Sequence, residues 1–224
     1  MLPLLVLGFL LGMRHATDAD HVVAVSTIVS RERSIRAAAP IGALWGVGHT
    51  LTMMLVGGAI IGFGLVIPPR VGLTMELVVA GMLLLLGGMN LRGVLRRTDA
   101  TQRVDVPGTT ENGRLTRLRP VLVGVAHGLA GSAAVALLVL GSIRNTGWAV
   151  AYLGVFGAGT IAGMVLVTTA FALPIAATAG RFERLHRALG IVTGITSLIL
   201  GAVLVYRIGF IAGLFSTHPT WRPE

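Results

Sequence analysis

The sequence has no cysteine, no lysine and few acidic or aromatic residues. Without cysteine the chain can form no disulfide, thiolate metal site or thiol redox centre, so nitrogen and oxygen atoms must hold any metal ion that it binds. Charged residues make up only 12% of the chain, whereas 54% are hydrophobic and the mean hydropathy is +0.84. A soluble domain of this size needs more charge to cover its surface, so we expect a membrane protein in a lipid bilayer.

Arginine supplies all 18 basic residues and, against 9 acidic residues, gives a net charge of +9. A chain this basic is a candidate for nucleic-acid binding. The arginines, however, lie in polar breaks between apolar stretches, where membrane proteins carry them, and few aromatic residues accompany them for base stacking. We therefore expect the lipid bilayer, and no nucleic acid, as a partner.

Several apolar stretches are long enough to cross a bilayer as helices. They comprise residues 4–29, 37–67, 73–95, 120–143, 147–176 and 186–211. The polar segment 96–119 has no apolar periodicity and is expected to be an arginine-rich cytoplasmic loop. The sequence thus predicts an all-α polytopic membrane protein of about six transmembrane helices, with residues 1–95 and 120–224 as two halves of three helices each.

The distribution of arginine predicts the orientation of these helices, because cytoplasmic loops carry an excess of basic residues. With Arg14 set aside inside the first stretch, thirteen arginines lie in the first, third and fifth breaks, and four lie on the other side, at positions 70, 144, 207 and 222. This asymmetry predicts that both termini lie outside the cytoplasm. The expected location is the inner (plasma) membrane of a prokaryote.

The two halves show a weak internal repeat. His15 in the run Gly-Met-Arg-His and His127 in the run Gly-Val-Ala-His fall at matching places in the first helix of each half. Glycines of the third helices match at nearly the same offset, in the pairs Gly81 with Gly194 and Gly88 with Gly201. Because each half has an odd number of spans, the expected arrangement is a 3+3 inverted repeat, as in many secondary transporters.

Charged and polar residues interrupt the first apolar stretch near its middle, in the run Arg14-His15-Ala16-Thr17-Asp18-Ala19-Asp20-His21. At the centre of a bilayer its three charged residues cost roughly 7 to 10 kcal/mol. The twelve Leu, Val, Ile and Phe residues between positions 4 and 29 offset only roughly 4 to 7 kcal/mol of this cost. The segment therefore needs partners inside a helix bundle.

Two interpretations of this run stay open. It can be a structural ion-pair network in which Arg14 neutralises Asp18 one turn later. It can also be a metal site, because two imidazoles and two carboxylates suit nickel, cobalt or zinc. On a regular helix His15, Asp18 and His21 share an arc of about 120°. Asp20 points away from that arc, so either it orients a histidine or the helix unwinds here.

The next helix adds His49, which follows Gly48 and is therefore able to approach the first helix closely. A single histidine in an apolar helix is usually a satisfied polar group, but beside this run His49 is a candidate ligand. The repeat makes His127 a further candidate from the second half, and Arg14 is a candidate supporting group. His186 and His218 lie at the edges of spans and receive no role.

The run from Arg14 to His21 resembles the hallmark of the nickel/cobalt transporter family, a His-x4-Asp-His motif within Arg-His-Ala-x-Asp-Ala-Asp-His, at every fixed position. The Gly-His-Thr at positions 48–50 is similar to the family's second signature. In place of the family's acidic signature, the second half has His-Gly-Leu-Ala-Gly-Ser from position 127, similar to short six-helix members labelled urease accessory or high-affinity nickel-transport proteins. The resemblance implies metal recognition and uptake by His15, Asp18, Asp20, His21 and His49, with Ni²⁺ or Co²⁺ as the transported ion rather than a cofactor.

These features favour a secondary permease for a divalent transition-metal ion, and efflux would use the same chemistry in reverse. A membrane metalloenzyme is the rival, because two histidines and a carboxylate can form the open triad of non-haem iron oxygenases. The sequence lacks a His-Glu-x-x-His run, so we predict no enzyme. A third hypothesis is an accessory protein that passes nickel to an enzyme such as urease through the loop 96–119, and a homo-oligomer also stays open.

Overall fold

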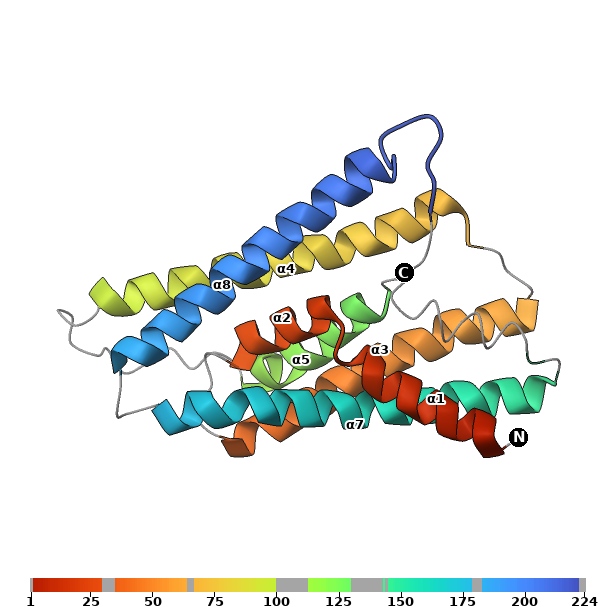
Figure 1. The fold of residues 1–224 in the computed structure, drawn as a ribbon, viewed down its shortest axis with the longest axis horizontal. Helices are drawn as coiled ribbons and strands as arrows, with labels where there is room; N and C mark the ends of the chain where they lie inside the picture. Colours follow the sequence, from red (N-terminus) through yellow and green to blue (C-terminus); the bar gives the residue numbers. More distant parts are fainter. Residues whose placement is uncertain are drawn as a thin grey trace.

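The computed structural model of the protein describes residues 2–29, 35–63, 67–99, 113–129, 143, 145–178 and 183–221, and these residues form helices and no strand (Figure 1). Among them, four helices are long and apolar enough to cross a membrane. These are α3 (Ile35–Phe63), α4 (Pro69–Asp99), α7 (Thr146–Thr178) and α8 (Glu183–Tyr206), which a short π-helical turn, Arg207–Ile211, extends. They coincide with the second, third, fifth and sixth predicted spans, which confirms the prediction of a helical membrane protein.

The first predicted span is two short helices, α1 (Leu2–His15) and α2 (Ala19–Val29), separated by a break. In the break, Thr17 and Asp18 donate their backbone N–H groups to carbonyls three residues back, at 2.8 and 3.1 Å, which tightens the chain into a turn. A new helix then begins where Val22 donates to the carbonyl of Asp18. Asp18 and Asp20 thus lie at the N-terminal end of α2, where the helix dipole favours negative charge.

The fourth predicted span is described only in part, as α5 (Gly113–Gly128), because residues 130–142 lie outside the described residues. The predicted loop 96–119 is shorter than expected at both ends. Helix α4 continues to Asp99, and α5 already begins at Gly113. A run of polar residues therefore does not end these helices, since helix ends extending out of a bilayer can be polar.

The helices form two layers that α2 joins (Figure 1). Helix α1 packs on α7, α5 packs on α3, and α3 and α7 pack on each other, so these four form one layer. Helices α4 and α8 form the other as a crossed pair. Helix α2 lies between the layers and contacts α4, α7 and α8. The break before α2 therefore lies at the junction of the two layers, with Ala16 buried and Thr17 exposed.

Polar side chains fasten the α2, α4 and α8 contact. Asn90 of α4 donates to the carbonyl of Gly190 at 2.9 Å, and Ser197 of α8 donates to the carbonyl of Leu83 at 2.8 Å. Thr27 of α2 donates to the carbonyl of Thr193 at 3.4 Å. Such bonds between helices stabilise a bundle in lipid, where burial of apolar surface gives little driving force.

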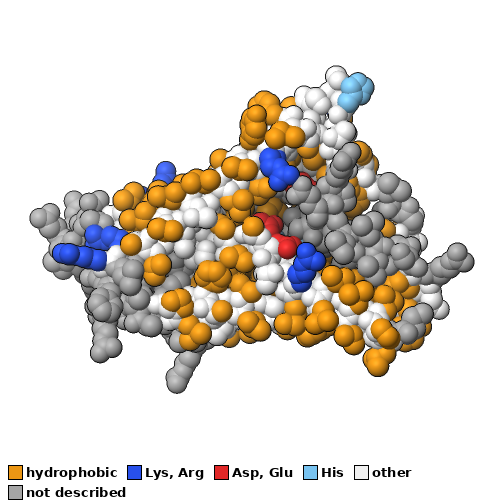
Figure 2. Space-filling view, viewed as in Figure 1, with side chains coloured by type: hydrophobic (Ala, Val, Ile, Leu, Met, Phe, Trp, Pro, Cys, Tyr) orange, Lys and Arg blue, Asp and Glu red, His pale blue; other side chains and the backbone are white. Residues whose placement is uncertain are grey.

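The outer surface is apolar along the helices. Less than half of each spanning segment is buried inside the protein, and many large hydrophobic side chains are exposed. Figure 2 shows hydrophobic side chains over most of the described surface of one face, with a small group of acidic and arginine side chains near its middle. A surface of this kind matches lipid rather than water.

Candidate metal centre

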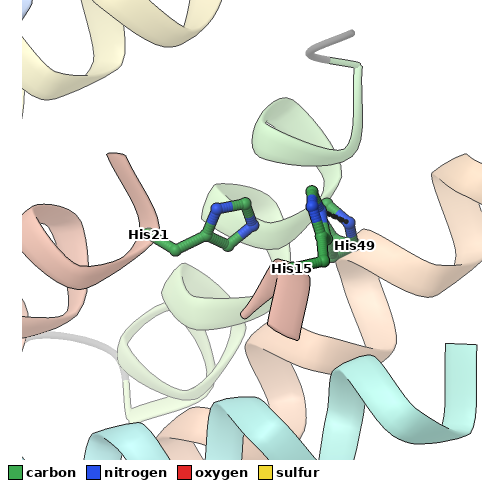
Figure 3. A group of neighbouring side chains, drawn as sticks. All are labelled: His15, His21 and His49. Atoms are coloured by element: carbon green, nitrogen blue, oxygen red, sulfur yellow. Dashed lines mark hydrogen bonds between the residues drawn. The ribbon is translucent and has the colours of Figure 1, made fainter. Parts of the chain in front are cut away.

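Three histidines from separate elements come together in the bundle. His15 is the last residue of α1, His21 lies in the first turn of α2, and His49 lies near the middle of α3. All three are buried, and their ring centroids are 4.6 Å (His15 to His21), 5.0 Å (His15 to His49) and 5.2 Å (His21 to His49) apart. Figure 3 shows the His21 ring pointing across toward the other two. We call this group the three-histidine position.

Two aspartates hold the rings of His15 and His21. The Nδ1 atom of His15 lies 2.9 Å from Oδ2 of Asp18, and Nδ1 of His21 lies 3.1 Å from Oδ1 of Asp20. A carboxylate accepts hydrogen bonds, so both Nδ1 atoms donate and both Nε2 atoms are left with a lone pair. A metal-binding histidine is usually oriented in this way, with a carboxylate on its other nitrogen.

The nitrogen atoms lie at the separation that one metal ion requires. Nε2 of His15 and Nε2 of His49 are 3.1 Å apart. Two nitrogens bound to one ion at about 2.1 Å are separated by about 3.0 Å at a right angle and by about 3.4 Å at a tetrahedral angle. Nε2 of His21 is buried and has no hydrogen-bond partner among the described residues. These atoms can therefore bind one borderline divalent ion, and Asp18 and Asp20 together balance its charge.

His127, near the end of α5, lies beside the three-histidine position, with its ring centroid 6.2 Å from that of His49. Its ring is fully buried, 4.0 Å from the ring of His21, and its Nε2 atom lies 3.0 Å from Oδ2 of Asp20. Asp20 therefore accepts a hydrogen bond from a histidine of each half. A second group of potential ligand atoms, from Asp20, His21 and His127, lies within 4.8 Å of one another.

Close contact between α3 and α5 positions His49 and His127. A Cβ atom on Gly124 would lie 2.1 Å from the carbonyl oxygen of Trp45, and one on Gly128 would lie 2.6 Å from the carbonyl oxygen of His49. Only glycine allows backbones to approach this closely. The glycines of α5 therefore set the distance at which its histidine meets α3.

Aromatic side chains close the site. Trp45 is fully buried, and its ring is nearly parallel to that of His21, at 6.3 Å between centroids. Phe156 of α7 lies 5.8 Å from the ring of His15. These rings exclude water from one side of the histidines and so lower the local dielectric. Neither residue was predicted to belong to the site, although Phe156 stands in the second half close to where Trp45 stands in the first.

The structure brings together six of the seven predicted site residues. His15, Asp18, Asp20, His21, His49 and His127 form one connected group. Arg14 is exposed, and the Asp18 carboxylate accepts a hydrogen bond from His15. The predicted ion pair between Arg14 and Asp18 is therefore not the contact that Asp18 makes. Both interpretations of Asp20 agree with the structure. The helix breaks before Asp20, and Asp20 accepts hydrogen bonds that orient the rings of His21 and His127. His218 is exposed and lies on the C-terminal segment.

Comparison with known proteins finds a relative along nearly the whole chain. Over 221 residues the chain is 34% identical to the urease accessory protein UreH of Bacillus sp. (strain TB-90), and the alignment covers 96% of each protein. No family model matches the chain, and no solved structure matches it. Identity of this extent along both chains is found between members of one protein family.

Proposed function

The chain belongs to the nickel/cobalt transporter family, as UreH does, and on this premise we propose that it carries Ni²⁺ or Co²⁺ across the membrane through the three-histidine position. The observation that supports this most is the convergence of three buried histidine nitrogens inside a bundle of lipid-facing helices. Ionisable residues at this depth are costly and are retained where they bind or move ions. Imidazole ligands without thiolate suit borderline ions such as nickel and cobalt.

We further propose that residues 1–95 and 120–224 form a 3+3 inverted repeat, which the contacts between helices support. Helix α1 approaches α7 at Gly12, where an added Cβ would lie 2.1 Å from the carbonyl oxygen of Phe156. Helix α5 approaches α3 at Gly124, where an added Cβ would lie 2.1 Å from the carbonyl oxygen of Trp45. Gly12 corresponds to Gly124 in the repeat, and Trp45 corresponds to Phe156. The two contacts therefore join equivalent residues, with the first and second halves exchanged.

The contact between α3 and α7 has the same symmetry. Gly46 meets the Ile161 side chain, and Gly157 meets the Thr50 side chain, so each helix contributes a glycine and a β-branched residue. The contacts run in opposite directions along the two helices, which are therefore antiparallel, as corresponding helices of an inverted repeat must be. Rocking of such halves about a site between them is how many secondary transporters expose an ion to each side in turn.

The orientation remains a proposal, with both termini outside the cytoplasm of a prokaryotic cell. Because the chain has no cysteine, a single introduced cysteine is the only thiol of the protein that a maleimide can label. A membrane-impermeant maleimide added to intact cells should label Thr217→Cys, and it should label Arg96→Cys only after the cells are broken. Both positions are exposed on the described surface. The reverse labelling pattern would contradict the orientation.

Flux measurements test the proposed function. Cells that express the protein should accumulate more radiolabelled nickel than cells with an empty vector, because the site gives the ion a path across the membrane. The purified protein should also move nickel into proteoliposomes. Reduced accumulation together with flux in proteoliposomes would indicate an exporter. Absence of flux in proteoliposomes, with the protein folded, would refute transport.

A urease-linked delivery role is the second candidate, because the relative is named a urease accessory protein. Since that relative is an accessory protein, the comparison favours a non-enzyme over the metalloenzyme hypothesis. Urease activity, measured in the same cells as nickel accumulation, separates delivery from uptake. A permease should raise both quantities, whereas a delivery partner should raise urease activity at unchanged accumulation.

A further inference from the structure

His21 lies between two histidines that occupy equivalent places in the two halves. Its ring centroid is 4.6 Å from that of His15 and 4.0 Å from that of His127, and the repeat relates these two residues to each other. The three-histidine position uses residues of the first half alone. Beside it, the group formed by Asp20, His21 and His127 joins α2 to the second half through α5.

This second group has the properties of a binding position. His21 and His127 are fully buried, and the Asp20 side chain is 17% exposed. Its carboxylate oxygens lie 3.1 Å from Nδ1 of His21 and 3.0 Å from Nε2 of His127, close to the separation of two ligand atoms on one ion. Two of its ring nitrogens, Nε2 of His21 and Nδ1 of His127, are buried without a hydrogen-bond partner among the described residues.

We propose that Asp20, His21 and His127 form a second position for the transported ion, which it enters as it leaves the three-histidine position. The inference rests on the proposed function and adds the step between the halves. His21 is a ligand in both positions, through Nε2 in the first and through Nδ1 in the second, and the ion exchanges His15 and His49 for His127 and a carboxylate oxygen of Asp20. The proposed repeat relates His15 to His127, so the step passes the ion from a histidine of the first half to its counterpart in the second half.

A single ion occupies the two positions in turn. A neutral imidazole has one nitrogen lone pair, and in the three-histidine position His21 presents Nε2 while Nδ1–H donates to Asp20. In the second position the ion binds Nδ1 of His21, Nε2 of His127 and a carboxylate oxygen of Asp20. These contacts replace the hydrogen bonds that Asp20 accepts from the two rings. The rings of His21 and His127 then carry their protons on Nε2 and Nδ1, the two unpartnered atoms. Each ring therefore gives up a proton from one nitrogen to water and takes one from water on the other nitrogen, so the pair of rings gains and loses none in total.

The test combines nickel binding with nickel flux, using the full-length protein in proteoliposomes and nickel chloride as the probe. His127→Phe removes the ligand, whereas His127→Gln keeps an N–H donor for Asp20 and so preserves a merely positioning role. His218→Gln, at an exposed histidine, is the matched control. His15→Ala removes the three-histidine position and leaves the second group intact. X-ray absorption at the nickel edge counts the imidazole ligands in each protein.

Both His127 variants should bind one nickel ion with three imidazoles at an affinity within about threefold of the unmodified protein, and their flux should fall at least about tenfold. His218→Gln should match the unmodified protein. His15→Ala should keep weaker nickel binding through two imidazoles and a carboxylate oxygen. Adding His127→Phe to His15→Ala should abolish that remaining binding.

Unchanged flux in both His127 variants would overturn the second position and leave the proposed function standing. Flux restored by His127→Gln but not by His127→Phe would also overturn it, because His127 would then only position Asp20. Loss of the three-imidazole binding in the His127 variants would show that His127 holds the fold, which overturns the proposal as well. Absence of nickel binding and flux in the unmodified protein would refute the proposed function itself.

Discussion

Replacing His21 by alanine is expected to abolish nickel transport, with the largest effect of any single histidine substitution. His21 presents Nε2 to His15 and His49, and its Nδ1 atom faces Asp20, so its loss removes a ligand from each proposed position. Loss of a carboxylate that only orients a metal ligand weakens binding about 10- to 100-fold, so loss of the ligand itself should weaken nickel binding at least about 100-fold. Radiolabelled nickel accumulation and equilibrium nickel binding measure the two effects.

A conservative variant separates this chemistry from stability. His21 is fully buried, so alanine leaves a cavity and removes one hydrogen bond from Asp20. In His21→Asn the side-chain amide can still donate to Asp20 in place of Nδ1, but no atom replaces Nε2. We expect His21→Asn to reach the membrane at the normal level and to be as inactive as the alanine variant. Transport retained by His21→Asn would contradict the role of Nε2 as a ligand.

The metal motif could be predicted from the sequence because each of its charged residues has a known free-energy cost of insertion into a bilayer. His15, Asp18, Asp20 and His21 stand in an apolar segment that cannot offset them, which predicts partners inside a bundle. The sequence could not decide how Asp20 joins the group. On a regular helix it points away, and only the turn at Thr17 and Asp18 brings it toward His21 and His127.

The aromatic walls of the site could not be predicted, for a physical reason that concerns membranes. In water, an apolar residue such as Phe156 identifies the buried face of a helix. In lipid, both the interior and the outer surface are apolar, so hydrophobicity does not distinguish them. The same limit applies to glycine. Gly12 faces another backbone, whereas a Cβ on Gly58 would meet nothing, and the sequence does not distinguish the two positions.

The proposed repeat rests on matches in the sequence, but these matches do not give a single register. The offset that matches His15 with His127 is longer by one position than the offset that matches the contacts of α3 and α7, and the shorter offset pairs His49 with Thr160. Connecting segments of different length change the offset from helix to helix, and glycine-rich stretches align at several offsets. The contacts decide between these offsets because each close approach involves two particular residues. In this register the second half offers a threonine where the first half offers His49.

Replacing Gly12 by leucine is expected to prevent stable folding. A Cβ at this position would lie 2.1 Å from the carbonyl oxygen of Phe156 and 2.8 Å from the backbone nitrogen of Thr160. Both are backbone atoms, so α1 would have to move away from α7 and carry His15 with it. Overpacking of a well-packed contact costs about 1 to 3 kcal/mol, and a leucine against a backbone should exceed that range. Thermal unfolding in detergent and the amount of protein in the membrane measure the effect.

The inverted repeat predicts the same result for a residue in the other half. Gly124→Leu should destabilise the protein as strongly as Gly12→Leu, because its Cβ would lie 2.1 Å from the carbonyl oxygen of Trp45 in the equivalent contact. Gly58→Leu and Gly81→Leu are the controls, since a Cβ at either position meets nothing within 4 Å. Glycine is roughly 0.8 to 1 kcal/mol less favourable in a helix than alanine, and leucine ranks just below alanine, so the controls should be at least as stable as the unmodified protein. A normal melting temperature for Gly124→Leu, together with a strongly lowered melting temperature for Gly12→Leu, would contradict the equivalence of the two halves.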